Sequence, residues 1–209
     1  MNGADKTEVI FKNGAIYRGA WLNNQKNGYG IQQWPDGARY EGEWFKNKAH
    51  GGGKFWHADG DTFEGEWKDD KANGYGIYVH KDGARYEGQW KDDLQHGYGQ
   101  ESWADGSKYD GTYNDGKKHG KGKYLWADGS QYDGDWVENK IDGYGRYNWI
   151  DGRQYEGNWR SNNMHGYGKY VWKDGRSYDG HYENDKKHGY GVYIWADKRK
   201  YEGNWNQGK

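Results

Sequence analysis

The polar and apolar positions of this chain repeat with a period of 23 residues. The recurring pattern is aromatic, any residue, glycine, any residue, aromatic, and its nine copies begin at Tyr17, Tyr40, Phe63, Tyr86, Tyr109, Tyr132, Tyr155, Tyr178 and Tyr201. No insertion or deletion interrupts the spacing, so each repeat is predicted to be one structural unit stacked on the next. In an enzyme, the repeat that holds the catalytic residues would differ in sequence from the others. Here the residue types that could take part in chemistry recur at the same position of each repeat.

One repeat is long enough for two short strands and two turns. In residues 63–85 we expect a strand at 63–67, a turn at 68–73, a strand at 74–80 and a turn at 81–85. Alternation along the first strand places Phe63, Gly65 and Trp67 on one face and the two glutamates between them on the other. The pattern therefore predicts a sheet with one aromatic face and one solvated face.

The second strand combines glycine with large aromatic residues on the same face. In one copy the residues that share this face are Gly143, Gly145, Tyr147 and Trp149. Glycine inside a strand costs about 0.5 to 1 kcal/mol relative to alanine, so its recurrence indicates that a side chain must be absent there. We expect Tyr and Trp rings to lie flat over the glycine backbone of neighbouring strands.

The turns between repeats carry Asp-Gly pairs. They are Asp36-Gly37, Asp59-Gly60, Asp82-Gly83, Asp105-Gly106, Asp128-Gly129, Asp151-Gly152 and Asp174-Gly175, with Asn13-Gly14 before them. Pro35-Asp36-Gly37 is typical of a type I turn that ends in a left-handed glycine. The last copy has Lys198 in place of the glycine, so we expect strain or fraying there.

These elements predict an all-β fold, an elongated single-layer antiparallel sheet of stacked 23-residue β-hairpins with about 18 strands. Residues 1–16 are expected to form an N-terminal partial repeat or cap, and residues 17–209 one continuous domain of eight full repeats and a partial ninth. Nothing in the pattern covers the aromatic face, which should remain an open groove. The end strands near Val9 and Tyr201 should leave unpaired edges, which predicts a homodimer through them.

Composition narrows the classes of protein. The chain has 209 residues, no cysteine and a net charge of -1, and its 39 Phe, Trp and Tyr residues far exceed its 15 Val, Ile and Leu. The 31 Lys and Arg are balanced by 32 Asp and Glu, which argues against nucleic acid as a partner. No apolar run indicates a signal peptide or a membrane span, so we expect a cytoplasmic protein that is not secreted.

Three motifs invite a chemical interpretation, and each has a simpler one. Gly28-Tyr29-Gly30 and its successors have no following helix that could hold phosphate. The histidines before these glycines alternate with Asn and Asp, which indicates a turn-forming position rather than a metal ligand. Paired carboxylates such as Glu41 and Glu43 fall on the solvated face. We therefore expect no enzyme, no catalytic residue, no metal and no cofactor.

The sequence resembles MORN repeats along essentially its whole length. The residues that carry the resemblance are Tyr-Glu-Gly-Glu-Trp at 40–44, His-Gly-Tyr-Gly at 96–99 and 165–168, and the phased Asp-Gly turns. The resemblance implies an antiparallel hairpin array that is not itself catalytic. It further implies a scaffold in a cytoskeletal or ciliary (axonemal) assembly, with some family members gripping a partner helix, some dimerising and some proposed to bind phospholipids.

The leading functional hypothesis is a scaffold whose aromatic groove docks a protein partner, with an amphipathic helix as the expected ligand. The predicted groove residues are Trp44, Trp67, Trp90, Trp136, Trp159, Tyr40, Tyr86, Tyr132 and Tyr155. Tyr113 and Tyr182 replace tryptophan at the second aromatic position, where a weaker grip is expected. The alternative is a peripheral tether that binds anionic phospholipid through Lys117, Lys118, Lys186, Lys187, Lys198, Arg199 and Lys200.

Overall fold

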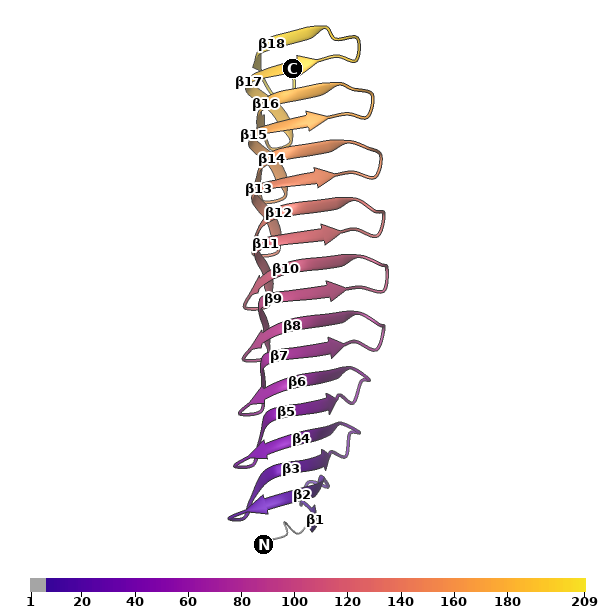
Figure 1. Ribbon diagram of the computed structural model, residues 1–209, viewed down its shortest axis with the longest axis vertical. Coiled ribbons are helices and arrows are strands. Elements are labelled where there is room, and N and C mark those ends of the chain that lie inside the picture. Colours follow the sequence, from indigo (N-terminus) through magenta and orange to yellow (C-terminus); the bar gives the residue numbers. More distant parts are fainter. Residues whose placement is uncertain (1–6) are drawn as a thin grey trace. The chain divides into compact units, whose positions relative to one another are not determined.

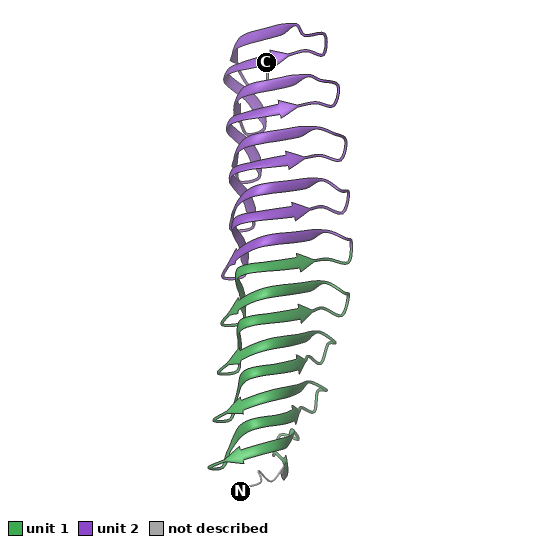
Figure 2. Cartoon of the chain, viewed as in Figure 1, with its two compact units in different colours: residues 1–104 green, residues 105–209 purple. Residues whose placement is uncertain are grey.

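The computed structural model describes residues 7–209, which contain 18 strands and no helix (Figure 1). The chain divides into two compact units, residues 1–104 and residues 105–209 (Figure 2). Residues 1–6 of the predicted N-terminal cap lie outside the described residues, and the rest of the cap contributes β1.

Each unit contains nine strands. The first has β1 (Thr7–Ile10), β2 (Ile16–Leu22), β3 (Gln25–Gln33), β4 (Arg39–Phe45), β5 (Lys48–Trp56), β6 (Thr62–Lys68), β7 (Lys71–Val79), β8 (Arg85–Lys91) and β9 (Leu94–Ser102). The second has β10 (Lys108–Asn114), β11 (Lys117–Leu125), β12 (Gln131–Val137), β13 (Lys140–Asn148), β14 (Gln154–Arg160), β15 (Asn163–Val171), β16 (Ser177–Glu183), β17 (Lys186–Ile194) and β18 (Lys200–Trp205).

Within each unit every strand pairs antiparallel with its neighbours in sequence, from β1–β2 to β8–β9 and from β10–β11 to β17–β18. In each unit the hairpins therefore follow one another along the sheet, as Figure 1 shows. The predicted all-β array of antiparallel hairpins is confirmed. The end strands β1 and β18 pair with β2 and β17 in the described chain. Dimerisation through their outer edges stays a prediction.

A tyrosine ring, or in one case the Phe63 ring, lies over a pair of facing glycines in each of the hairpins from β2–β3 to β16–β17. In β4 and β5, Gly42 pairs with Gly53, and a methyl group placed on Gly53 would lie 2.3 Å from Tyr40 Oη. The Tyr40 hydroxyl donates to the Glu43 carbonyl at 2.9 Å, which satisfies its one polar group. The predicted contact of aromatic rings with glycine backbone is confirmed, because any side chain at Gly53 would displace the ring.

The first glycine of each Gly-x-Gly has a different role. Gly51 has a φ of 71°, and the register of β4 and β5 shifts between Gly42 and Trp44. This is a β-bulge, which glycine favours because it reaches the left-handed region without strain. The prediction that both glycines pack against rings is wrong for the first of them. His50 lies in the bulge inside β5, so the prediction that histidine marks a turn is also wrong.

The turns between repeats have the predicted form. Gly37, with a φ of 96°, donates its amide to the Trp34 carbonyl at 3.0 Å, and Asp36 Oδ1 accepts from the Ala38 amide at 2.9 Å. The last turn keeps this geometry, since Lys198 N donates to the Trp195 carbonyl at 2.9 Å with a φ of 71°. Lys198 therefore sits in a strained conformation rather than in a different turn.

The turn inside each hairpin is shorter than predicted and links consecutive repeats. Asp69 and Asp70 both have positive φ, 51° and 68°, as a type I′ turn requires, and β7 already begins at Lys71. Asp70 Oδ1 accepts from the Ala49 amide at 2.7 Å, and the Asp70 amide donates to the Ala49 carbonyl at 3.0 Å. The same backbone bond fastens the turns at Asn47, Asp93, Asn139, Asn162 and Asp185 to the second strand of the preceding repeat.

The ring contact predicts opposite effects for two glycines of β5. Gly53→Ala should lower the free energy of unfolding by about 3 kcal/mol because the methyl group overpacks the Tyr40 ring. Gly52→Ala meets only Glu43 Oε1, at 3.6 Å, and should be neutral or stabilising by a few tenths of a kcal/mol. Urea denaturation followed by tryptophan fluorescence measures both, and equal effects would contradict the ring contact.

Lys198→Gly is expected to stabilise the β17–β18 hairpin by about 1 kcal/mol, because glycine removes the steric penalty of the left-handed conformation. Hydrogen exchange of the amides in β17 and β18 should slow relative to the wild-type chain. Lys173→Gly, one residue before the Asp174-Gly175 pair, is the matched control and should not stabilise its turn. Faster exchange in Lys198→Gly would show that the lysine is not strained.

Candidate functional site

An edge-to-face ladder of rings forms the floor of the aromatic face. Tyr40 meets Trp44 at 5.0 Å and Trp67 at 5.3 Å between ring centroids, with interplanar angles of 85° in both cases. The predicted groove tyrosines are almost fully covered, Tyr40 and Tyr86 at 1% exposed and Tyr132 and Tyr155 at 0%. These four side chains therefore lie beneath the more exposed rings and support the groove, and their part in docking a partner stays a prediction.

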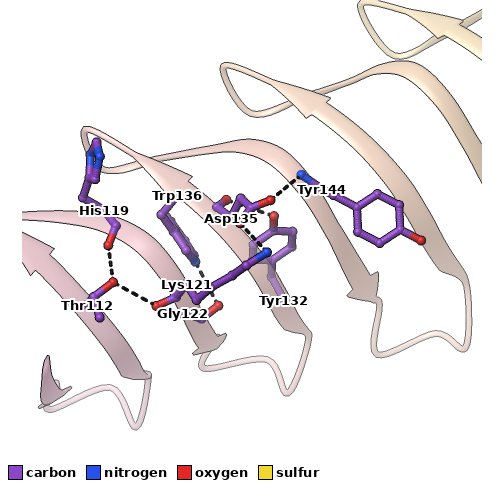
Figure 3. Close-up of polar contacts among 8 residues, drawn as sticks. All are labelled: Thr112, His119, Lys121, Gly122, Tyr132, Asp135, Trp136 and Tyr144. Carbon is purple, nitrogen blue, oxygen red and sulfur yellow. Dashed lines mark hydrogen bonds and ion pairs between the residues drawn. The ribbon is translucent and has the colours of Figure 1, made fainter.

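The tryptophans are fixed by hydrogen bonds to the glycine backbone. Trp136 Nε1 donates to the Gly122 carbonyl at 3.0 Å, and the Tyr132 hydroxyl donates to the Asp135 carbonyl at 3.0 Å (Figure 3). The same indole bond recurs 14 residues apart at Trp44, Trp67, Trp90, Trp159 and Trp205. Tyr182 keeps the ring contact, with its ring centroid 5.3 Å from that of Tyr155, but it lacks the indole N–H that would donate this hydrogen bond.

Exposure separates the predicted tryptophan anchors into two groups. Trp44, Trp136 and Trp159 are buried at 5%, 5% and 7% exposed, whereas Trp67 and Trp90 are half-buried. Trp67 and Trp90 are thus the predicted anchors with the most accessible ring surface. Both lie in the first unit.

Two neighbouring cavities lie beside these tryptophans, and we call the surface that they form the aromatic groove. One, of about 340 Å³, is lined by Phe55, His57, Phe63, Trp67, Asp70, Ala72, Tyr78, Trp90 and Asp93. The other, of about 310 Å³, is lined by Lys26, Trp34, Tyr40, Trp44, Asn47, Ala49, Phe55, Trp67 and Asp70. Sequence reasoning missed Phe55, Tyr78 and the acidic rim, although all three recur at the repeat spacing.

Lys26 reaches the groove from its N-terminal side and is 9% exposed. Its Nζ lies 3.7 Å from the ring centroid of Trp44 and 2.5 Å from Gln32 Oε1, to which it donates. Burial lowers the pKa of Lys26 to about 8, with the charge of Asp70 opposing the shift. A cation is therefore held inside an aromatic environment at some free-energy cost.

The opposite face, predicted to be solvated, also carries aromatic residues. Tyr29, Tyr75, Tyr98, Tyr144, Tyr167 and Tyr190 are between 41% and 55% exposed there. Tyr29 donates its hydroxyl to Glu41 Oε1 at 2.6 Å, and Tyr190 to Glu202 Oε1 at 2.6 Å. Their signal was present in the sequence, because the tyrosine of Gly-Tyr-Gly has the opposite parity to both glycines.

The paired carboxylates act within the sheet. Asp135 Oδ1 lies 2.5 Å from Lys121 Nζ and its Oδ2 accepts from the Tyr144 amide at 2.8 Å (Figure 3). Glu64 pairs across the strands with Lys54 at 3.0 Å. Among residues 7–209 no group of three or more His, Asp or Glu side chains has an arrangement that could hold a metal ion.

The basic residues named for lipid binding do not share one environment. Lys117 pairs with Glu138, Arg199 with Asp197 at 2.7 Å, and Lys200 with Glu202 at 2.5 Å. Lys118 and Lys187 instead lie over aromatic rings, with Lys187 Nζ 4.3 Å from the Tyr193 ring centroid. Within residues 7–209, the ammonium groups of Lys186 and Lys198 form no ion pair with a carboxylate and lie over no aromatic ring.

The depressed pKa of Lys26 predicts stability that rises with pH. Between about pH 8 and 10 the unfolded chain binds a proton at Lys26 that the folded chain has lost, so the free energy of unfolding increases. Above pH 10 the buried tyrosines act in the opposite sense, since burial raises the pKa of Tyr17 to about 12. Urea denaturation of Lys26→Met and wild type at pH 8 and 10 should show a wild-type gain that the variant lacks. A difference that does not change with pH would contradict the buried position.

Comparison with known proteins identifies the repeat. The family model for the MORN repeat matches residues 17–39, 40–62, 63–85, 86–108, 109–131, 132–152, 155–175 and 178–198. No curated protein matches the chain. In the described residues, no helix has the length and apolar character needed to cross a membrane.

Solved structures with similarity to the chain have low sequence identity to it. The SAS-4 (dCPAP) TCP domain of Drosophila melanogaster, in complex with a proline-rich motif of Ana2 (dSTIL), is 8% identical, with 98% of this chain and 93% of that chain covered and a TM-score of 0.40. The G-box domain of the microcephaly protein CPAP is 13% identical, with 96% and 99% covered and a TM-score of 0.39. Similarity at this level supports no inference about role. The eight phased matches, by contrast, span most of the sequence, and the chain belongs to the MORN repeat family.

Proposed function

We propose that the chain is a non-catalytic scaffold that docks a protein partner in the aromatic groove of its first unit, with an amphipathic helix as the partner segment. The observation that carries the proposal is the pair of adjacent cavities lined by Phe55, Trp67, Tyr78 and Trp90. Tryptophan and tyrosine often dominate the binding energy of interfaces when they lie in such pockets. A helix that lays its apolar side along a groove is a recurrent way to cover such a surface.

The rigid floor favours recognition with little rearrangement. The buried ladder of Tyr40, Phe63 and Tyr86 fixes the tryptophans above it through edge-to-face contacts of 5.0 to 5.3 Å. A partner therefore meets side chains that are already ordered, which reduces the entropy lost on binding. Placement of this scaffold in a cytoskeletal or ciliary assembly stays a prediction from the family resemblance.

Direct binding of anionic phospholipid has less support. Three of the seven basic residues named for it are paired with carboxylates, and two lie over rings. An anionic surface is attracted by clusters of 4 to 8 unpaired basic residues near the membrane. Sedimentation with vesicles that contain phosphatidylserine tests this alternative, and salt-sensitive binding would support it.

The scaffold proposal predicts the effect of Trp67→Ala combined with Trp90→Ala. Loss of the two accessible anchors should reduce capture of the native partner from cell extract at least tenfold, as expected for truncated interface anchors. The matched control is Tyr75→Ala combined with Tyr98→Ala, which removes exposed rings from the opposite face.

Folding must be separated from binding, because Trp67 and Trp90 also bond to the backbone at 3.0 and 3.1 Å. Hydrogen exchange of β4 to β9 reports the integrity of the sheet in both double variants. A folded Trp67→Ala, Trp90→Ala variant that captures the same proteins as wild type would refute the groove as the docking site.

A further inference from the structure

Four aromatic side chains surround the ammonium group of Lys187 in the second unit. Lys187 Nζ lies 4.3 Å from the ring centroid of Tyr193, 4.6 Å from Trp205, 5.4 Å from Tyr178 and 5.6 Å from Trp172. A cation within about 6 Å of an aromatic ring is attracted by the electrons of its face. We call the side chains at these four repeat positions the aromatic cage.

Lys26 occupies the same cage in the first repeat. Its Nζ lies 3.7 Å from Trp44, 5.6 Å from Tyr17 and 5.9 Å from Phe11, and the fourth position is Gln32, whose Oε1 accepts from Nζ. The same geometry therefore recurs seven repeats apart with the same type of occupant.

A third lysine supports this pattern. Lys118, at the same repeat position, lies 5.2 Å from the Tyr109 ring and 5.7 Å from the Tyr124 ring. Three repeats of the chain thus place an ammonium group beside the rings of the cage. The cage is therefore suited to a basic side chain.

Two neighbouring repeats have the cage without the lysine, because alanine stands at the equivalent position. The cage positions around Ala72 are His57, Phe63, Tyr78 and Trp90, and all four line the cavity of about 340 Å³. Those around Ala49 are Trp34, Tyr40, Phe55 and Trp67, and all four line the cavity of about 310 Å³. The two cavities of the aromatic groove are therefore the cages whose internal lysine is absent.

The rim of these open cages carries acidic residues, with Lys26 beside Asp70 in the cavity at Ala49. Asp70 lines both cavities and Asp93 lines the one at Ala72. Their Oδ1 atoms each accept a backbone amide at 2.7 Å, whereas among residues 7–209 neither Oδ2 has a recorded partner. At the equivalent position of another repeat, the neutral Asn139 accepts the Lys118 amide with its Oδ1 at 2.9 Å. The turn therefore does not require a charged side chain.

We propose that the two open cages bind lysine or arginine side chains of the docked partner, so that the partner supplies the cations that Lys26 and Lys187 supply elsewhere. This inference rests on the proposed function and adds the chemistry of the ligand. Rings attract the cation, and the Asp70 and Asp93 carboxylates neutralise it. The acidic rim disfavours anionic headgroups for the same reason.

The spacing of the cages defines the partner segment. Consecutive repeats lie two strand spacings apart, about 9.6 Å. On an α-helix, residues seven apart are separated by about 10.5 Å and lie on one face. The matching ligand is an amphipathic helix with basic residues at positions i and i+7 and apolar residues between them on the same side.

The test is selection of a displayed library of random 20-residue peptides on the full chain, with Ala49→Lys combined with Ala72→Lys as the filled-cage variant. Peptides with two basic residues at this spacing should be enriched on the wild-type chain and lost on the filled-cage variant. By isothermal titration calorimetry, replacing one such lysine of a selected peptide by norleucine should weaken binding about fivefold to tenfold.

A second variant keeps the test independent of the folding of the first. Asp70→Asn combined with Asp93→Asn preserves the backbone bond, as Asn139 shows, and should weaken lysine peptides but not their norleucine versions. Selected peptides without paired basic residues, or with affinity unchanged in both variants, would overturn the cage inference while leaving the groove intact. Enrichment of no peptide would contradict both proposals. Binding of phosphatidylcholine vesicles that is lost in the filled-cage variant would overturn the peptide as occupant.

Discussion

The structure depends on one contact, a tyrosine or phenylalanine ring laid over two glycines that face each other across a hairpin. Tyr40 can be 1% exposed in a single sheet because Gly42 and Gly53 present only backbone beneath it. With 15 Val, Ile and Leu in 209 residues, no aliphatic layer is available to do the same. The ring closes its own hydroxyl on a nearby carbonyl at 2.9 Å, so its burial leaves no polar group unpaired.

This contact also sets where function can vary. Because the ladder of rings and the indole bonds occupy fixed positions, the residue at the position of Ala72 is free to differ between repeats without disturbing the sheet. At this repeat position the chain has Lys26 and Lys187, Ala49 and Ala72, and Ile141. A repeat protein can in this way change the chemistry of its groove one repeat at a time while its fold stays constant.

The parts of the structure that follow from local rules could be predicted from sequence. Alternation placed Phe63 and Trp67 on one face, and Asp36-Gly37 predicted its turn, because these depend on strand parity and on the left-handed glycine. The bulge at Gly51 was missed because a glycine needed for its backbone looks the same as one needed for ring contact. Lys187 was assigned to a basic surface because only coordinates show that rings surround its ammonium group.

Proton NMR of the glycine Hα atoms shows whether rings cover the second glycine of each Gly-x-Gly and not the residue before it. A ring lying over Gly53 shifts its Hα resonances upfield through the ring current, whereas Gly52, on the opposite face, is not covered. We predict upfield Hα shifts at Gly53, Gly145 and Gly168 and ordinary strand values at Gly52. Ordinary values at all four glycines would contradict the ring contact.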